Sequence, residues 1–339
     1  MTGYYIEFES VGNAVLKEFE IPQLKDDEVL LETDYSVVSA GTERANLMGM
    51  PNTQTGEEGG SFPHYPGYCG AGRVVAMGKA VTNLNIGDRA VIAWGGHRSH
   101  LVKKAPSVLK IEDDSIDSLD AAFANIVSFS LLGVRKLKIE LGESVMIAGM
   151  GILGVFALQL ANLSGAVPVV VSDLDPVRRE LALKLGASAA FSPAEDGFID
   201  KVKAATGGRG PDAVVEVTGS AAALQQALEY IAWEGRISLL GCTRISDVPI
   251  DFYKYVHRRG VSLIGAHTST RAKQESAPGR WTEHDDYRTF LRLVAAGKIQ
   301  TRPLISEIVS PEAAHDVYAR LAENNNPPLG IVFDWRKIK

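Results

Sequence analysis

One segment, Ser144–Asp173, constrains the fold of this 339-residue chain more than any other. It opens with the apolar run Val145–Ala148, which is typical of a buried strand, and continues with Gly149, Gly151 and Gly154 in the spacing G-x-G-x-x-G. The first glycine permits a tight turn, the second lets a pyrophosphate approach the backbone, and the third lets a helix lie close to the strand. The segment therefore predicts the strand, turn and helix of a dinucleotide-binding unit.

An apolar helix is expected over Ile152–Leu163, directly after this turn. The unpaired N–H groups and the dipole at its N-terminus would bind the pyrophosphate, so Ile152 and Leu153 join the three glycines in the predicted cofactor site. The alternative is a glycine-rich turn in an unrelated parallel sheet.

A second strand, Val167–Val171, leads to Asp173, which lies nineteen residues after Gly154. A carboxylate at this distance would bind the ribose hydroxyls of NAD and would repel the 2′-phosphate of NADP. Arg178 and Arg179 follow on the next helix and keep NADP as the weaker alternative.

Composition and charge exclude several classes of protein. The net charge of −6 disfavours nucleic acid as a partner. We expect a cytoplasmic protein, because the N-terminus lacks the pattern of a signal peptide and no apolar run approaches membrane-spanning length. The two cysteines, Cys69 and Cys242, are too few for a disulfide framework or a cysteine-rich zinc lobe, and Cys242 is expected to be a small core residue.

Strands alternate with helices after about residue 118, which predicts a doubly wound parallel sheet. The further elements expected there are helices over Ala121–Leu132, Pro176–Leu185 and Ala221–Ile231, and strands over Ala189–Ser192, Ala213–Val217, Ile237–Leu240 and Ser262–Ala266. Ligands of such sheets bind at the carboxyl ends of the strands. The residues expected at those ends, and hence in the cofactor site, are Thr218, Gly219, Gly241, Cys242, Thr243 and Ala266.

The chain on either side of this region has another character. Residues 1 to about 115 contain short strands, expected over Glu28–Glu32, Ser36–Ser39, Gly72–Val75 and Arg89–Ala93, and a loop over Met48–Pro63. The C-terminal part predicts a long polar loop after His267, helices over Asp285–Ala296 and Pro311–Ala322, and a strand over Gly330–Asp334. We therefore expect a discontinuous domain of residues 1–118 and 268–339 around a nucleotide-binding domain of residues 119–267.

Four motifs together resemble the medium-chain dehydrogenase/reductase superfamily over nearly the whole chain. They are Ala40–Glu43 (AGTE), Pro66–Gly72 (PGYCGAG), Gly87–Arg89 (GDR) and the glycine fingerprint. The resemblance implies an α/β protein with a GroES-like β-rich catalytic domain and a Rossmann nucleotide-binding domain. The sequence of Ser39–Arg44 (SAGTER) is similar to that of the branch that contains bacteriochlorophyllide dehydrogenases and sugar or cyclitol dehydrogenase-like proteins.

The chain departs from the zinc-containing members of that family at each ligand position. Ala40 stands where they carry cysteine, Tyr68 and Cys69 stand where they carry His-Glu, and the third ligand falls near Asn125. A catalytic zinc needs about three protein ligands. We therefore expect neither a catalytic nor a structural zinc site.

Without a metal, a side chain must move the proton. Tyr68 occupies the position of a lost ligand, so a lowered pKa would let it exchange a proton with the substrate oxygen; otherwise it is an aromatic wall. Thr42 matches the family's proton-relay hydroxyl, or else caps a turn. Glu43 matches an acid that is usually structural and is a weaker catalytic candidate.

Four further residues are candidates for substrate binding. Trp94 would stack on a ring-shaped substrate, and His97, His100 and His267 are possible bases. For each of them an ordinary core or surface position is the alternative.

The predicted function is zinc-independent hydride transfer between NAD and a secondary alcohol or ketone, with a polyol, cyclitol or sugar-like substrate. The alternatives are reduction of a conjugated double bond, as in zinc-free quinone and enoyl reductases, and a non-catalytic dinucleotide-binding protein. The resemblance also implies a homodimer that pairs through Ser262–Ala266, and leaves a tetramer open.

Overall fold

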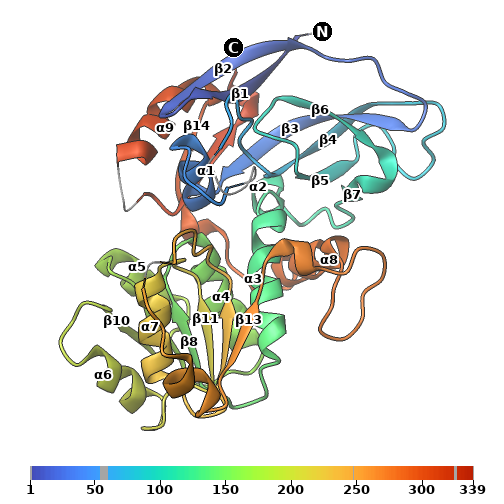
Figure 1. Ribbon diagram of the computed structural model, residues 1–339. Coiled ribbons are helices and arrows are strands. Elements are labelled where there is room, and N and C mark those ends of the chain that lie inside the picture. Colours follow the sequence, from blue (N-terminus) through green and yellow to red (C-terminus); the bar gives the residue numbers. More distant parts are fainter. Residues whose placement is uncertain (1, 54–59, 247, 324–326, 339) are drawn as a thin grey trace. The chain divides into compact units, whose positions relative to one another are not determined.

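Six parallel strands form the sheet that the glycine-rich segment predicts (Figure 1). Their order across the sheet is β10-β9-β8-β11-β12-β13. The strands are β8 (Val145–Ala148), β9 (Val169–Ser172), β10 (Ala189–Phe191), β11 (Ala213–Glu216), β12 (Arg236–Leu239) and β13 (Ser262–Gly265). This is the order of the Rossmann doubly wound fold, with the chain reversing direction across the sheet between β8 and β11.

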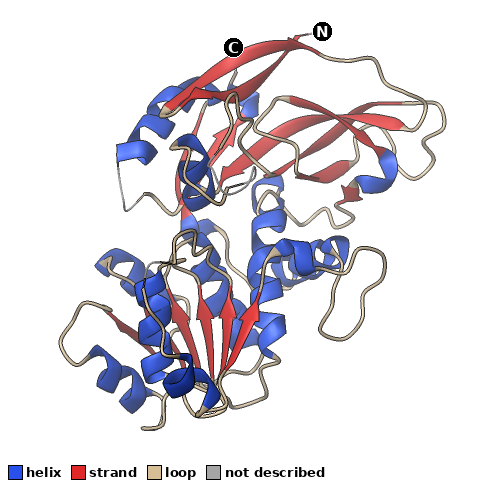
Figure 2. Ribbon diagram, viewed as in Figure 1, coloured by secondary structure: helices blue, strands red, loops and turns tan. Residues whose placement is uncertain are grey.

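Helices flank this sheet (Figure 2). They are α3 (Ala124–Leu137), α4 (Ile152–Leu163), α5 (Pro176–Lys184), α6 (Phe198–Ala205) and α7 (Ala221–Tyr230). Gly154 sets how closely α4 approaches the strand before it, since a Cβ atom there would lie 1.9 Å from the carbonyl oxygen of Gly149. The apolar strand residues pack against Phe198 and Leu228 in one buried cluster.

A second set of strands builds the β-rich unit. Its large sheet has the order β14-β15-β3-β4-β5-β7, with β6 beside β3, and β1 and β2 form a separate hairpin. The strands are β1 (Thr2–Ser10), β2 (Asn13–Glu20), β3 (Glu28–Val38), β4 (Cys69–Met77), β5 (Arg89–Ala93), β6 (His100–Lys104), β7 (Leu109–Lys110), β14 (Ile305–Val309) and β15 (Gly330–Asp334). Its helices are α1 (Ala40–Leu47), α2 (Ser118–Ala121) and α9 (Ala314–Glu323).

Two predictions for this unit were wrong. The strands expected over Glu28–Glu32 and Ser36–Ser39 are one continuous strand, β3, because the polar interruption at Asp34 is buried and paired with Arg73 at 2.7 Å. Sequence analysis also gave no helix at α1, whose buried side carries Glu43 and Asn46 in place of an apolar stripe. The loop expected over Met48–Pro63 falls partly outside the described residues, which are 2–53, 60–246, 248–323 and 327–338 in this computed structural model.

The chain divides into two compact units, Met1–Ile126 with Tyr287–Lys339, and Val127–Asp286. The expected boundaries at 118/119 and 267/268 therefore differ from those of the structure. Residues 268–286 belong with the parallel sheet because Arg271 anchors them to α3. Its guanidinium donates to Ser128 Oγ at 2.6 Å and pairs with Glu283 at 2.9 Å, and it is buried. Helix α8 (Glu283–Ala295) follows this anchored loop.

Two further features bear on the predictions. Within the residues that the structure describes, no helix has both the length and the apolar character needed to cross a membrane. Strand β13 lies at one edge of the parallel sheet, and pairing of two copies through it stays a prediction.

Candidate functional site

Three hydroxyl groups of the β-rich unit meet at Tyr68. Tyr68 directly precedes β4 and is only 7% exposed. Its phenol donates to Ser39 Oγ at 2.5 Å and is also hydrogen-bonded by the Thr42 hydroxyl. Ser39 immediately precedes α1 and Thr42 lies in its first turn, so the entry of one helix and the start of one strand bring together two predicted site residues and one, Ser39, that sequence analysis missed.

The pKa of Tyr68 moves in the direction opposite to the one expected. Burial raises it, and the neighbouring Cys69 and Glu43 raise it further, while the hydrogen bonds with Ser39 and Thr42 offset only part of the rise. Tyr68 therefore keeps its proton at neutral pH, which suits a hydrogen-bond or proton donor and not a standing phenolate.

The main chain of Tyr68 is held as firmly as its hydroxyl. Its carbonyl oxygen accepts from Asn125 Nδ2 at 2.6 Å and from the Trp94 backbone N–H at 3.1 Å. Asn125 is itself fixed by the Tyr287 hydroxyl, which donates to its Oδ1 at 2.9 Å. The Asn125 amide thus fixes the backbone of Tyr68.

Trp94 presents an aromatic face beside this hydroxyl cluster. Its ring lies 5.4 Å from the Tyr68 ring at an interplanar angle of 31°, and 45% of its surface is exposed. Its φ of 56° is a conformation that bulky residues rarely adopt. Such strain tends to mark functional positions, in keeping with the expected substrate-side role.

Glu43 and His97 form a pair in the core, each about 1% exposed. His97 Nε2 lies 3.0 Å from Glu43 Oε2, and His97 Nδ1 lies 2.7 Å from Ser36 Oγ. Two predictions need correction here: His97 is too buried to meet a substrate, and Glu43 is equally enclosed.

The other two histidines are placed differently. His100, at the start of β6, is half-buried and lies 3.0 Å from Ser99 Oγ through its Nδ1. His267 belongs to the other unit, where it is exposed and its Nδ1 accepts from the Ser269 backbone N–H at 3.2 Å. The His267 imidazole, which was expected near a substrate, therefore caps a short helical turn through its Nδ1.

The donor set at the positions where the resemblance places zinc ligands does not fit zinc. Ala40 offers only a methyl group, the Tyr68 hydroxyl is bonded to Ser39 and Thr42, and the Asn125 amide is bonded to Tyr68 and Tyr287. Across the described part of the chain, no three His, Cys, Asp or Glu side chains gather so that they could hold a metal ion.

The glycine turn and the acid after β9 meet in the Rossmann unit. Asp173 Oδ2 accepts from the Met150 backbone N–H at 2.7 Å, and its Oδ1 accepts from the Asp175 N–H at 2.9 Å. Gly151 caps α4 without a side chain, and a Cβ atom there would meet no protein atom within 4 Å. The backbone is therefore uncovered beside the helix N-terminus, and binding of a pyrophosphate there stays a prediction.

The remaining predicted cofactor residues follow β11, β12 and β13. They are Thr218, Gly219, Gly241, Cys242, Thr243 and Ala266. Cys242 is exposed, so its expected core position was wrong. Sequence analysis missed Glu216, whose buried carboxylate accepts from the backbone N–H groups of Thr218 at 2.8 Å and Gly219 at 3.3 Å and so fixes the shape of this loop.

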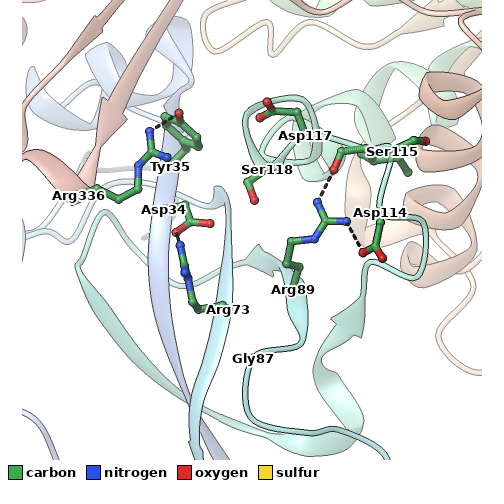
Figure 3. Close-up of a pocket in the computed structure, with 11 residues that line it drawn as sticks. Asp34, Tyr35, Arg73, Gly87, Arg89, Asp114, Ser115, Asp117, Ser118 and Arg336 are labelled. Atoms are coloured by element: carbon green, nitrogen blue, oxygen red, sulfur yellow. Dashed lines mark hydrogen bonds and ion pairs between the residues drawn. The ribbon is translucent and has the colours of Figure 1, made fainter.

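A polar cavity of about 560 Å³ opens elsewhere on the β-rich unit (Figure 3). Its lining carries Arg73, Arg89 and Arg336, but each guanidinium is bonded to a neighbour: Asp34, the carbonyl oxygen of Asp113, and Asp334 respectively. These internal bonds satisfy the charges that a ligand would need, and we assign the cavity no function.

Comparison with known proteins agrees with the two-part architecture. A family model described as zinc-binding dehydrogenase matches residues 153–294. Sorbitol dehydrogenase of Bacillus subtilis is 22% identical over 346 residues, which cover 94% of this chain and 93% of that protein. D-guloside 3-dehydrogenase of Escherichia coli is 25% identical over 346 residues, which cover 94% of this chain and 97% of that protein.

Solved structures share the fold over almost their full length. Galactitol-1-phosphate dehydrogenase of Escherichia coli superposes with a TM-score of 0.82 at 20% identity, covering 98% of this chain and 99% of that one. A Sinorhizobium meliloti protein in a crystal structure bound to NADP has the same TM-score at 22% identity, with the same coverage. The expected GroES-like and Rossmann fold is confirmed.

Proposed function

Because this chain belongs to the medium-chain dehydrogenase/reductase superfamily, we propose that it transfers a hydride between a nicotinamide cofactor and a secondary alcohol or the corresponding ketone. The observation that carries the proposal is the buried cluster of hydroxyl groups at Tyr68, a residue that the resemblance aligns with a zinc ligand of the metal-containing members. The sorbitol and D-guloside dehydrogenases among the relatives favour a polyol, cyclitol or sugar-like substrate.

Oxidation of a secondary alcohol removes a hydride from carbon and a proton from oxygen, and reduction returns both. When bound, the nicotinamide supplies or accepts the hydride. Tyr68 would hold the substrate oxygen and donate a proton to it during reduction, because burial keeps the phenol protonated. Thr42, which is partly exposed, and Ser39 are both bonded to the phenol, and they would pass a proton from solvent to Tyr68, each hydroxyl taking up one proton as it gives its own away. Trp94 would cover the apolar face of a ring.

The cofactor would be held by the glycine turn and by Asp173. Gly149, Gly151 and Gly154 shape the turn, the first N–H groups of α4 face the phosphates, and the Asp173 carboxylate binds the ribose hydroxyls. The backbone N–H groups of Met150 and Asp175 already orient that carboxylate. NAD is accordingly the proposed cofactor.

The experiment that tests this function follows the absorbance of reduced nicotinamide. Metal-stripped protein is mixed with NAD, and in parallel with NADP, together with sorbitol, galactitol, myo-inositol and methyl glycosides. Turnover with NAD that survives a chelator supports zinc-free oxidation. Turnover only after zinc is restored contradicts the zinc-free mechanism, and binding of NADH without turnover of alcohols or conjugated carbonyls favours a non-catalytic role.

Asp173→Asn is expected to weaken NAD binding by about 10- to 100-fold, the factor that corresponds to losing one hydrogen bond to a charged group. NADP binding is expected to tighten, because the variant removes the negative charge that opposes a 2′-phosphate. Arg178, whose Nη1 lies 4.0 Å from Asp173 Oδ2, then has one less anionic neighbour. Titration of both cofactors by fluorescence measures the change.

Glu180→Gln is the matched control, since it removes an equal charge from an exposed position on α5, the helix that follows Asp173. It is expected to leave both affinities unchanged. Equal losses for NAD and NADP in Asp173→Asn would mean that the carboxylate only maintains the local fold.

A further inference from the structure

We propose that His97, held by Glu43, is a positioning residue that fixes Tyr68 from two sides, at its hydroxyl and at its main chain. This inference rests on the proposed function, in which Tyr68 meets the substrate oxygen. His97 itself touches no reacting atom, and it would act only through the placement of the phenol.

The first route runs through Glu43 to the hydroxyl. Glu43 Oε2 lies 3.0 Å from His97 Nε2 and accepts from the Tyr318 hydroxyl at 2.5 Å, which leaves Oε1 to accept from the Ser39 backbone N–H at 2.8 Å. The carboxylate thereby fixes the backbone of Ser39, whose Oγ accepts the phenol hydrogen bond at 2.5 Å.

The second route reaches the backbone that leads into Tyr68. The His97 backbone N–H donates to the carbonyl oxygen of Pro66 at 2.7 Å. Its imidazole ring lies against Gly67, where an added Cβ atom would come within 2.6 Å of the ring. Gly67 has a φ of +92° and immediately precedes Tyr68, so the ring fills the place of a side chain at this turn.

The imidazole is itself fixed on its remaining sides. Trp335 Nε1 donates to Ser36 Oγ at 2.8 Å, and that oxygen lies 2.7 Å from His97 Nδ1. The Phe333 ring meets the imidazole edge-on with centroids 5.2 Å apart. Such support matters, because a displacement of about 1 Å at a reacting group can lower a rate by about 10²-fold.

A double-mutant cycle of His97→Gln and Tyr68→Phe tests the proposal. The ketone that corresponds to the best alcohol of the panel serves as substrate, and the kcat of its reduction by NADH is measured per NADH-binding molecule. In the Tyr68 protein, His97→Gln is expected to lower kcat by about 10- to 100-fold with an unchanged Kd for NADH. In the Tyr68→Phe background, the same change is expected to have no further effect, because groups that act as one unit are not additive.

Ser36→Ala and Tyr318→Phe are each combined with Tyr68→Phe in the same way. Ser36→Ala removes one hydrogen bond to His97, and Tyr318→Phe removes one to Glu43, while the contact between His97 and Glu43 is kept. These two variants test the proposal if His97→Gln does not fold. Each is expected to lower kcat less than His97→Gln does, and only in the protein that keeps Tyr68. His315→Gln is the matched control, because it changes an exposed histidine on α9, the helix that carries Tyr318, and it is expected to leave kcat unchanged.

Two outcomes overturn the inference while leaving the proposed function in place. One is a folded His97→Gln or Ser36→Ala protein with the kcat of the parent, and the other is an equal loss in both backgrounds. If Tyr68→Phe alone keeps the kcat of the parent, the proton role of Tyr68 fails, and the inference fails with it.

Discussion

Tyr68→Phe is expected to lower the kcat of ketone reduction by about 10²- to 10⁴-fold, the range that a positioned proton donor contributes to a rate. The substitution keeps the ring that packs beside Trp94 and removes only the hydroxyl that Ser39 and Thr42 bind. The Kd for NADH is expected to stay unchanged, since the glycine turn and Asp173 are intact. Steady-state kinetics and a cofactor titration measure both quantities.

Tyr65→Phe is the control for this prediction, because Tyr65 lies three positions earlier and half of its surface is exposed. It is expected to keep the kcat of the parent. If Tyr68→Phe kept it as well, the phenol would be an aromatic wall and the proton would travel by another route.

The pH dependence of ketone reduction checks the same assignment. Burial raises the pKa of Tyr68 above the ordinary tyrosine value of about 10, so the donor form persists past that pH. We therefore expect no loss of the reduction rate attributable to tyrosine ionisation up to about pH 10. A fall centred near pH 8 that is absent from Tyr68→Phe would contradict this.

The sequence predicts most accurately the parts that local physics determines. Strand β8 and helix α4 have the predicted bounds, because a fully apolar strand, a glycine turn and an apolar helix leave little choice of conformation. The position of Asp173 after β9 was equally readable, since its spacing from the glycines follows from the length of one helix and one strand, while its role toward the ribose stays a prediction. The structure adds the two backbone N–H groups that orient it.

The arrangement around Tyr68 depends instead on contacts between distant parts of the chain. Glu43 meets His97 from 54 positions away and Tyr318 from 275 positions away, and Ser36 meets Trp335 from 299. The hydrophobic periodicity of the sequence gives no information about such long-range pairs. Helix α1 was also not predicted, because the carboxylate on its buried side gives the segment the polarity pattern of a loop.

The direction of the Tyr68 pKa could not be read from residue types either. A tyrosine at a lost metal position suggested an activated phenol, but only the surrounding structure gives the extent of burial. At 7% exposure, desolvation opposes the phenolate more than two hydroxyl neighbours favour it. The same geometry that makes Tyr68 a poor base makes it a well-held donor.

Glu43→Gln is expected to lower the free energy of unfolding at neutral pH by about 1.5–3 kcal/mol, the contribution of hydrogen bonds to a charged group. Burial alone would raise the pKa of Glu43, but the attraction of His97 and the hydrogen bonds from His97, Tyr318 and the Ser39 N–H outweigh it and lower the pKa below 4.5. The variant removes that charge and leaves His97 enclosed. Denaturant unfolding followed by tryptophan fluorescence measures the difference.

The sign of the pH dependence separates an ionised Glu43 from a neutral one. A carboxyl whose pKa is lower in the folded state stabilises fully above its unfolded value, here about 4.5, and loses that contribution as the pH falls through the folded value. The gap between the parent and Glu43→Gln should therefore be widest near pH 7 and narrow below about pH 4.5. A gap that widened toward acid would mean that burial prevails and Glu43 is protonated.

Glu9→Gln, which breaks an exposed pair with Lys17, should cost at most about 1 kcal/mol and so calibrates the ordinary surface contribution.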